Sequence, residues 1–276
     1  MKVRMIVDST ADLAAGLREK LMIVPLSVRF GDREYTQGVD LTNEQFYDML
    51  SQSKELPTTS QPTPAAFEDK YREVVEAGDC AVVVTVSGRL SGTFQSAIIA
   101  AEDYEGRIFV VDSRSVAIGT GLLVQEGLKL IDQGLSAEEV FNQLIALRDK
   151  IQVYALLDTL EYLKKGGRIS SAVALAGGLL SIKPIICVKD GRVEMAGKAR
   201  GTKQGSASLL SAMDTLGADE GKPMLLGYTG QSREALDKFI RDNVARFGEN
   251  VPSAIVGSVV GVHAGPGAIA LAFFSK

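Results

Sequence analysis

The stretch CAVVVTVSGRLSGTFQSA, Cys80 to Ala97, carries the clearest signal of fold class in this sequence. Its first seven residues, Cys80–Val86, are apolar and mostly β-branched, which is typical of a strand buried on both faces. The hydroxyls and glycines that follow indicate a loop, and Ser91 or Thr93 can begin the next helix. A buried strand that leads through a polar loop into a helix is the repeating unit of a parallel α/β sheet.

The same alternation of strand and helix signals runs through the first half of the chain. Further buried strands are predicted at 3–7, 107–111 and 153–157. Helices are expected after the capping residues Thr42, Thr63 and Ser136 and over 115–132. We therefore predict an N-terminal α/β domain with a parallel sheet over residues 1–158.

The second half of the chain mixes hairpin and helix signals. Asp190-Gly191 lies between two apolar runs, as in a β-hairpin. The sequence further predicts helices ending at 165 and spanning 170–180, 204–216 and 233–247, and strands at 224–228, 254–260 and 269–274. A hairpin among helices is typical of an α+β fold, so we predict a C-terminal α+β domain over residues 159–276.

The composition argues against several classes of protein. The 276 residues carry a net charge of −4, no tryptophan and no long basic block, so a nucleic-acid partner is not expected. One histidine and two separated cysteines argue against a metal site. The motif Gly265-x-Gly267-x-x-Ala270 leads into a strand rather than a helix, so no nucleotide cofactor is predicted.

No segment of the sequence reads as a membrane anchor. The most apolar long window, 172–188, is interrupted by Ser181, Lys183 and Pro184. The N-terminal residues turn polar too soon for a signal peptide. We therefore expect a soluble, cytoplasmic protein with no integral membrane segment.

Ser91 raises the main question about function. As a nucleophile it would need a base, and His263 is the only histidine. The order of the two residues allows an α/β hydrolase, but Gly88-Arg-Leu-Ser91-Gly92 departs from G-x-S-x-G and no orienting carboxylate can be named. At a helix N-terminus, Ser91, Gly92 and Thr93 would instead offer hydroxyl and N–H groups to an anion, or simply cap the helix. An acyl hydrolase and an anion-binding protein both remain open at this point.

Other segments carry candidate binding groups that also have plainer interpretations. Asp8-Ser9-Thr10 follows the first strand, where α/β sheets bind ligands, but can equally cap a helix. PTTSQPTP, 57–64, is expected to be a loop, and its hydroxyls suit a binding site or an ordinary polar turn. His263 is expected in a glycine-rich loop between two strands, where a surface position is common. Arg168 can be a docking group or a cation that stabilises a helix end.

Taken together, these motifs resemble one family. DST (8–10), TSQP (59–62), SGRLSGT (87–93), VDS (111–113), KKGGRIS (164–170), KP (183–184) and HAGPG (263–267) occur in the order seen in the DegV family. The resemblance runs the whole length of the chain. It implies a fatty-acid-binding protein with no catalytic residue, metal or cofactor of its own, and with a lipid pocket between an α/β domain and an α+β domain. Some members are partner subunits of a fatty acid kinase, which converts the fatty acid they present into an acyl-phosphate.

The resemblance also implies roles for individual residues. Thr59 and Ser91 would bind the carboxylate of a long-chain fatty acid. Arg168 would lie near the mouth of the pocket and meet the fatty acid kinase subunit. The small apolar segments 115–123 and 172–182 are candidates for contact with the acyl chain, although both can equally be ordinary core. The residues that would support the carboxylate site are Ser60, Gly92, Thr93 and His263.

Overall fold

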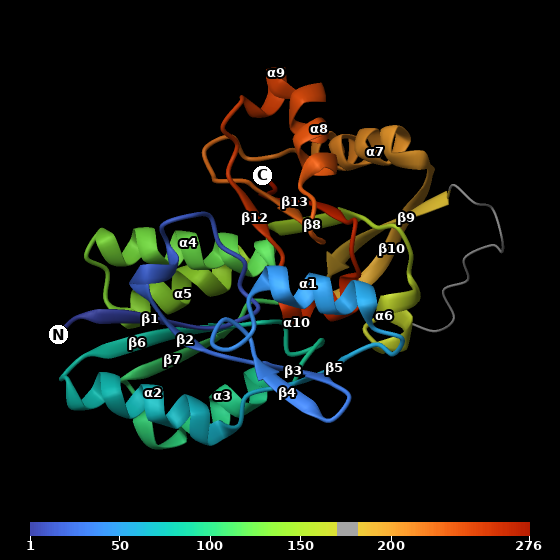
Figure 1. Ribbon diagram of the computed structural model, residues 1–276. Coiled ribbons are helices and arrows are strands. Elements are labelled where there is room, and N and C mark those ends of the chain that lie inside the picture. Colours follow the sequence, from blue (N-terminus) through green and yellow to red (C-terminus); the bar gives the residue numbers. More distant parts are fainter. Residues whose placement is uncertain (170–181) are drawn as a thin grey trace.

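The computed structural model describes residues 1–169 and 182–276 and contains two large sheets and one small one (Figure 1). The first sheet is parallel, with its strands in the order β2 (Leu21–Val24), β1 (Val3–Asp8), β6 (Cys80–Thr85) and β7 (Ile108–Asp112). Helices α2 (Pro64–Glu76) and α3 (Thr93–Ala101) cover one face, and α4 (Ile118–Asp132) and α5 (Ala137–Arg148) cover the other. The predicted parallel α/β sheet is confirmed.

The central strand β1 shows why the middle residues of these strands, Met5–Val7 in β1, are all apolar. Met5 and Val7 belong to the core cluster that contains Leu122 of α4, whereas Ile6 belongs to the cluster that contains Phe67 of α2. Successive side chains of a strand point to opposite faces, and here each face is covered by helices. Full burial of such a side chain contributes about 1.5–3 kcal/mol.

The second sheet has six strands and is mixed. Its strand order is β10 (Arg192–Arg200), β9 (Ile182–Lys189), β8 (Ile151–Leu156), β13 (Ile269–Phe274), β11 (Leu225–Tyr228) and β12 (Ser253–Ile255). Helices α7 (Gly201–Leu216) and α8 (Glu234–Asp242) pack on one face, and α9 (Val244–Phe247) follows α8. Helix α4 packs on the other face, so it lies between the two large sheets.

Strand β8 corrects one expectation. The strand predicted at 153–157 was counted with the parallel sheet, but β8 lies in the second sheet, antiparallel to both β9 and β13. A strand buried between helices is apolar whichever way its neighbours run, so the residue pattern cannot assign it to a sheet. The division into domains at residue 158 stays a prediction.

Several local predictions are confirmed. Thr42 and Ser136 form capping boxes with Gln45 and Glu139. The hairpin of β9 and β10 turns at Asp190 and Gly191, with φ angles of 49° and 77°. The helix predicted at 170–180 lies outside the described residues. The helix predicted at 233–247 is divided into α8 and α9.

The third sheet brings two corrections. It consists of β4 (Arg33–Thr36), β3 (Ser27–Phe30) and β5 (Thr58–Ser60), so part of the expected 57–64 loop is an edge strand that pairs with β3. The strand predicted at 254–260 ends at Ile255, and helix α10 (Ser258–Ala264) follows. His263 is therefore helical and does not lie in a loop. A short apolar run such as VGSVVGV does not distinguish a strand from a buried helix.

Helix α10 fits closely beneath helix α1 (Asn43–Gln52) (Figure 1). A Cβ atom on Gly261 would lie 2.6 Å from the Phe46 ring and 2.8 Å from the Tyr47 hydroxyl. Only glycine permits this approach. The short helix α6 (Glu161–Lys165) also packs against α10.

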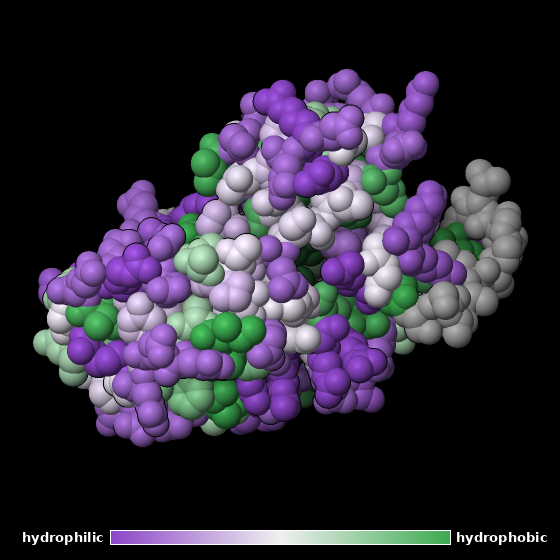
Figure 2. All heavy atoms as spheres, turned by 90° about the horizontal axis from the view of Figure 1, so that it is seen from below, coloured by the Kyte–Doolittle hydropathy of each residue, from purple (hydrophilic) through white to green (hydrophobic). Residues whose placement is uncertain are grey.

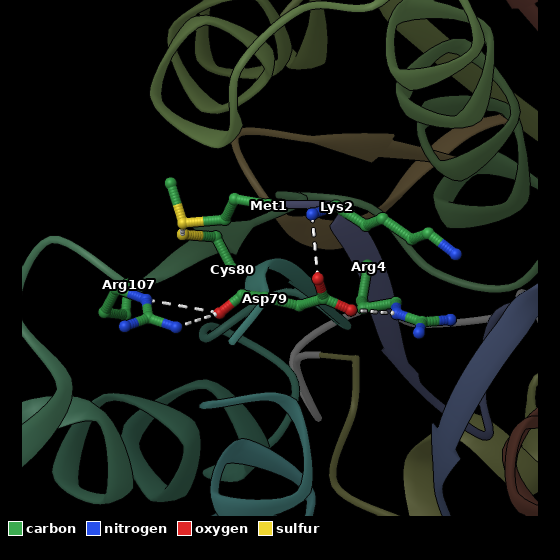
Figure 3. A network of polar contacts seen from close by, with 6 residues as sticks. All are labelled: Met1, Lys2, Arg4, Asp79, Cys80 and Arg107. Atoms are coloured by element: carbon green, nitrogen blue, oxygen red, sulfur yellow. Dashed lines mark hydrogen bonds and ion pairs between the residues drawn. The ribbon is translucent and has the colours of Figure 1, made fainter. Parts of the chain in front are cut away.

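A polar network lies at the amino ends of the strands of the parallel sheet (Figure 3). Oδ1 of Asp79 accepts a hydrogen bond from the Lys2 N–H at 2.8 Å, and Oδ2 accepts one from Nε of Arg4 at 2.9 Å. The carbonyl oxygen of Asp79 accepts from Nε and Nη2 of Arg107. The Lys2 amide and then Arg4 lower the pKa of Asp79. These bonds tie together the amino ends of β1, β6 and β7.

The surface seen from below is largely hydrophilic, with scattered apolar groups and a hollow near its middle (Figure 2). Within 1–169 and 182–276, no helix combines the length and apolar character needed to cross a membrane.

Candidate functional site

The candidate site lies at the carboxyl ends of β1 and β6, where α/β sheets bind ligands. Asp8, the last residue of β1, is fully buried, and its Oδ1 accepts hydrogen bonds from the Thr10 N–H at 2.9 Å and the Thr10 hydroxyl at 2.6 Å. Its Oδ2 accepts one from the Val86 N–H at 2.6 Å. Burial raises the pKa of Asp8, and these hydrogen bonds oppose the rise. Asp8 therefore ties together the segments that follow two neighbouring strands.

A cavity of about 160 Å³ lies beside these segments. Its apolar lining includes Leu26, Leu90 and Leu163. Its polar lining comes from distant parts of the chain: Thr10, Thr59, Gln61, Ser91, Arg168 and His263. Five of the residues singled out from the sequence therefore share one cavity: Thr10, Thr59, Ser91, Arg168 and His263.

Ser91 is held at the start of α3 by its neighbours. Its Oγ lies 2.8 Å from Oγ1 of Thr93 and accepts a hydrogen bond from the Thr93 N–H at 3.3 Å. Thr93 is fully buried, and Gly92 is the residue before the first turn of α3. A Cβ atom on Gly92 would lie 2.2 Å from Oε1 of Gln61. Thr93 therefore contacts Ser91 through its hydroxyl and its N–H, but neither Gly92 nor Thr93 is among the residues that line the cavity.

Thr59 lines the same cavity as Ser91 and lies on strand β5. Its Oγ1 lies 3.3 Å from Nε2 of His263. Thr59 pairs with buried Val28 of β3, whereas Ser60 next to it is exposed on the other face of the strand. Alternation along β5 therefore places the Thr59 side chain in the cavity and keeps Ser60 out of its lining.

His263 is neutral at physiological pH. Burial, and then the positive charge of Arg168, lower its pKa from 6.5 to about 4. Its Nδ1 is buried without a hydrogen-bond partner among the described residues, and a Cβ atom on Gly166 would lie 2.1 Å from it. Within the described ranges, His263 has neither an orienting carboxylate nor a hydrogen bond to Ser91, the two contacts that a hydrolytic triad requires.

Arg168 is anchored through two carbonyl groups. Its Nε donates to the Leu90 carbonyl at 3.2 Å, and its Nη1 donates to the Gly166 carbonyl at 2.6 Å. It is partly exposed. The guanidinium therefore links the end of α6 to the loop that precedes Ser91. Among the residues that the structure describes, no group of three or more His, Cys, Asp or Glu side chains could hold a metal ion.

A second, smaller cavity of about 70 Å³ adjoins the first, and both are lined by Val116, Ile186 and Val193. Its other walls are almost entirely apolar and come from α4 and the second sheet: Ile118, Val153, Ala155, Cys187, Ala268 and Ala270 are among them. The predicted segment 115–123 contributes Val116, Ala117 and Ile118, whereas residues 172–181 of the other predicted segment lie outside the described part.

Several lining residues, or their conformations, were not predicted from the sequence. Gln61 lies within the TSQP motif and could have been found there, since a side-chain amide suits a polar pocket. Ala117 lies within the predicted segment 115–123, but nothing in the sequence indicated its backbone conformation of φ 53° and ψ −127°, which L-residues rarely adopt. Ile186 and Val193 belong to the β9–β10 hairpin, and only the tertiary fold brings them to the cavity.

Comparisons with known proteins agree with this geometry. A family model described as "Uncharacterised protein, DegV family" matches residues 2–276. A DegV domain-containing protein of Deinococcus radiodurans is 35% identical over 278 residues, which cover 99% of this chain and 98% of the relative.

Two solved structures are also similar over the whole chain. One is a DegV family protein from Thermus thermophilus described by its fatty acid binding, with a TM-score of 0.89, 35% identity and 100% of both chains covered. The other is a stearic-acid-binding protein from Eubacterium ventriosum, with a TM-score of 0.86, 32% identity, and 100% of this chain and 99% of that chain covered. The chain described here belongs to the DegV family.

Proposed function

We propose that this protein binds a long-chain fatty acid and holds its carboxylate with the hydroxyls of Thr59 and Ser91. The observation that carries the proposal is that two cavities, one with hydroxyl groups and one almost entirely apolar, lie side by side and share wall residues. A fatty acid requires this combination of hydrogen-bond donors at one end and apolar walls along its chain. The fatty acids bound by the similar proteins support the same ligand class.

The charges at the polar end suit an anion. The polar lining groups Thr59, Ser91 and neutral His263 carry no negative charge that would repel a carboxylate. A hydrogen bond to a charged group contributes about 1.5–3 kcal/mol. Two hydroxyls therefore suffice for strong discrimination between a carboxylate and an uncharged head group.

The apolar end supplies the rest of the binding energy. Each methylene group that leaves water contributes about 0.8 kcal/mol. Ala155 and Ala270 lie opposite each other on β8 and β13, and their small side chains leave the space that the acyl chain would occupy.

We further propose that the protein performs no chemistry on the fatty acid and presents it to a fatty acid kinase subunit in the cytoplasm. Arg168 supports this proposal because it is partly exposed and also borders the polar end of the cavity. A guanidinium can pair with a carboxylate or a phosphate through two parallel hydrogen bonds, which makes it suitable for docking.

The test begins with protein purified from its host, whose bound lipid is extracted and identified by mass spectrometry. Delipidated protein is then titrated with palmitate and, separately, incubated with a p-nitrophenyl acyl ester. We expect a long-chain fatty acid in the extract, saturable binding of palmitate and no turnover of the ester. Turnover that disappears in Ser91→Ala would favour the Ser91/His263 hydrolase instead, and absence of palmitate binding would refute the proposal.

A further inference from the structure

Helix α10 carries His263 into the site, but no side chain of its own caps its amino end. The residue before its first turn is Gly257, which has no side chain that could accept a hydrogen bond. The first N–H groups of a helix lack partners within the helix and must find them elsewhere. Oδ1 of Asp12 accepts a hydrogen bond from the Gly257 N–H at 2.9 Å, and Oε1 of Gln37 accepts one from the Val259 N–H at 3.1 Å.

Both capping side chains come from the opposite end of the sequence. Asp12 is separated from Gly257 by 245 positions, and Gln37 is separated from Val259 by 222. Both side chains are buried. A Cβ atom on Gly257 would lie 2.2 Å from Nε2 of Gln37 and 3.2 Å from Oδ1 of Asp12, so a glycine is required where they meet the helix.

The two caps are themselves fixed in place. The Asp12 N–H donates to the Ala117 carbonyl at 3.3 Å, and a Cβ atom on Gly121 of α4 would lie 1.9 Å from the Asp12 carbonyl oxygen. Nε2 of Gln37 donates to the Ser9 carbonyl at 2.7 Å. The caps therefore connect α10 to α4 and to the segment after β1.

His263 lies at the other end of this short helix, four positions after Val259. Because α10 has only seven residues, a movement of its amino end is carried directly to the His263 ring. We infer that Asp12 and Gln37 are positioning residues: by capping α10, they set the place of His263 beside Thr59 and so shape the carboxylate site. This inference rests on the proposed function.

The single histidine makes a direct test possible, because the ring signals of ¹⁵N-histidine-labelled protein need no assignment. We would compare wild type with Asp12→Ala, Asp12→Asn and Gln37→Met by NMR, and measure palmitate affinity for each. Asp79→Ala is the matched control, since Asp79 and Asp12 are both 7% exposed and both accept a hydrogen bond from a backbone amide.

We expect the His263 ring signals to move in Asp12→Ala and in Gln37→Met, with a titration midpoint closer to 6.5 and palmitate affinity lower by about tenfold, the size expected for one lost cap. Asp12→Asn keeps an oxygen acceptor and should retain the wild-type signals and affinity. Asp79→Ala should leave the ring signals in place.

Unchanged ring signals in folded Asp12→Ala and Gln37→Met would overturn the inference, as would an equal change in Asp79→Ala. If Asp12→Ala does not fold, the ring signals of Gln37→Met give the same decision. Failure of wild type to bind palmitate would refute the proposed function separately, while the NMR comparison would still report whether the caps position His263.

Discussion

Oγ1 of Thr59 lies 3.3 Å from Nε2 of His263, although 204 positions separate the two residues in the chain. They meet because β5 and α10 both pack beside β3. The imidazole is neutral at physiological pH, so the pair presents hydrogen-bonding groups to the cavity without a charge of its own.

The first prediction concerns the two hydroxyls that we assign to the carboxylate. Thr59→Ala and Ser91→Ala should each lower palmitate affinity by about ten- to a hundredfold, because each removes a hydrogen bond to a charged group worth about 1.5–3 kcal/mol. Isothermal titration of delipidated protein measures the change.

Thr58→Ala is the matched control, because Thr58 lies on the same strand but is exposed and lines no part of the cavity. It should bind palmitate as wild type does. If Thr59→Ala and Ser91→Ala also bind normally, the carboxylate is held elsewhere.

The second prediction concerns the acyl chain. Ala270→Leu should fill the apolar cavity of about 70 Å³ and weaken palmitate binding. Binding of octanoate should change much less, because we expect its shorter chain to stay in the part of the cavity nearest Thr59 and Ser91. Competition titrations with both acids measure the ratio. Equal losses of affinity for palmitate and octanoate would mean that the acyl chain does not enter the apolar cavity beside Ala270.

The third prediction concerns Asp12 and pH. Burial raises the pKa of Asp12 from 3.8 to about 8, with Arg18 opposing the rise and Asp8 adding to it, and Tyr47 is also close enough to interact. The folded protein therefore binds this proton more tightly than the unfolded chain. The resulting stability is complete below pH 4 and is lost as the pH rises towards 8.

Asp12→Asn cannot ionise, so its unfolding free energy relative to wild type should increase steadily between pH 4 and pH 8. Urea denaturation of both proteins at several pH values measures this difference. The protonation of His263, which affects stability between pH 4 and 6.5 in the opposite sense, is common to both proteins and cancels. A difference that stays constant with pH would show that Asp12 titrates normally.

The structure also shows which of these features the sequence could predict. Strands β6 and β1 were predictable because burial on two faces leaves a run of successive apolar residues, Cys80–Val84 in β6 and Met5–Val7 in β1. The motifs around Thr59, Ser91 and His263 pointed to one cavity because they resemble one family. The helical state of His263 was missed because the apolar run from Val256 fits a strand and a helix equally well.

The caps on α10 could not be predicted. Neither Asp12 nor Gln37 lies in a motif that the sequence singles out. Their role depends on contacts across more than two hundred positions, which no local pattern records. The assignment of β8 to the second sheet failed for the same reason, since its neighbours β9 and β13 follow later in the chain.

The fourth prediction separates lipid binding from delivery. Arg168→Ala should keep palmitate affinity near that of wild type and sharply lower acyl-phosphate formation with the cognate fatty acid kinase, because in our proposal the hydroxyls hold the carboxylate and the guanidinium contacts the partner. Arg168→Lys should restore turnover only in part, since it keeps the charge but loses the paired donors. Lys165→Ala is the control, because Lys165 is exposed on α6 and pairs with Glu161.

Both assays are made on the same Arg168→Ala preparation. Loss of affinity together with turnover would place Arg168 among the carboxylate ligands. If palmitate affinity and kinase turnover are both normal, Arg168 serves only as a cation that stabilises the end of α6.

The most direct test of the central proposal compares palmitate with its methyl ester, which has the same acyl chain but no charge. Titration of delipidated protein should give much tighter binding of the acid, and the preference should fall in the Thr59→Ala/Ser91→Ala double variant. A hundredfold excess of palmitate over its Kd should add about 2.7 kcal/mol to the free energy of unfolding, and the ester much less. Equal affinity and equal stabilisation by the acid and the ester would contradict a site built around the carboxylate.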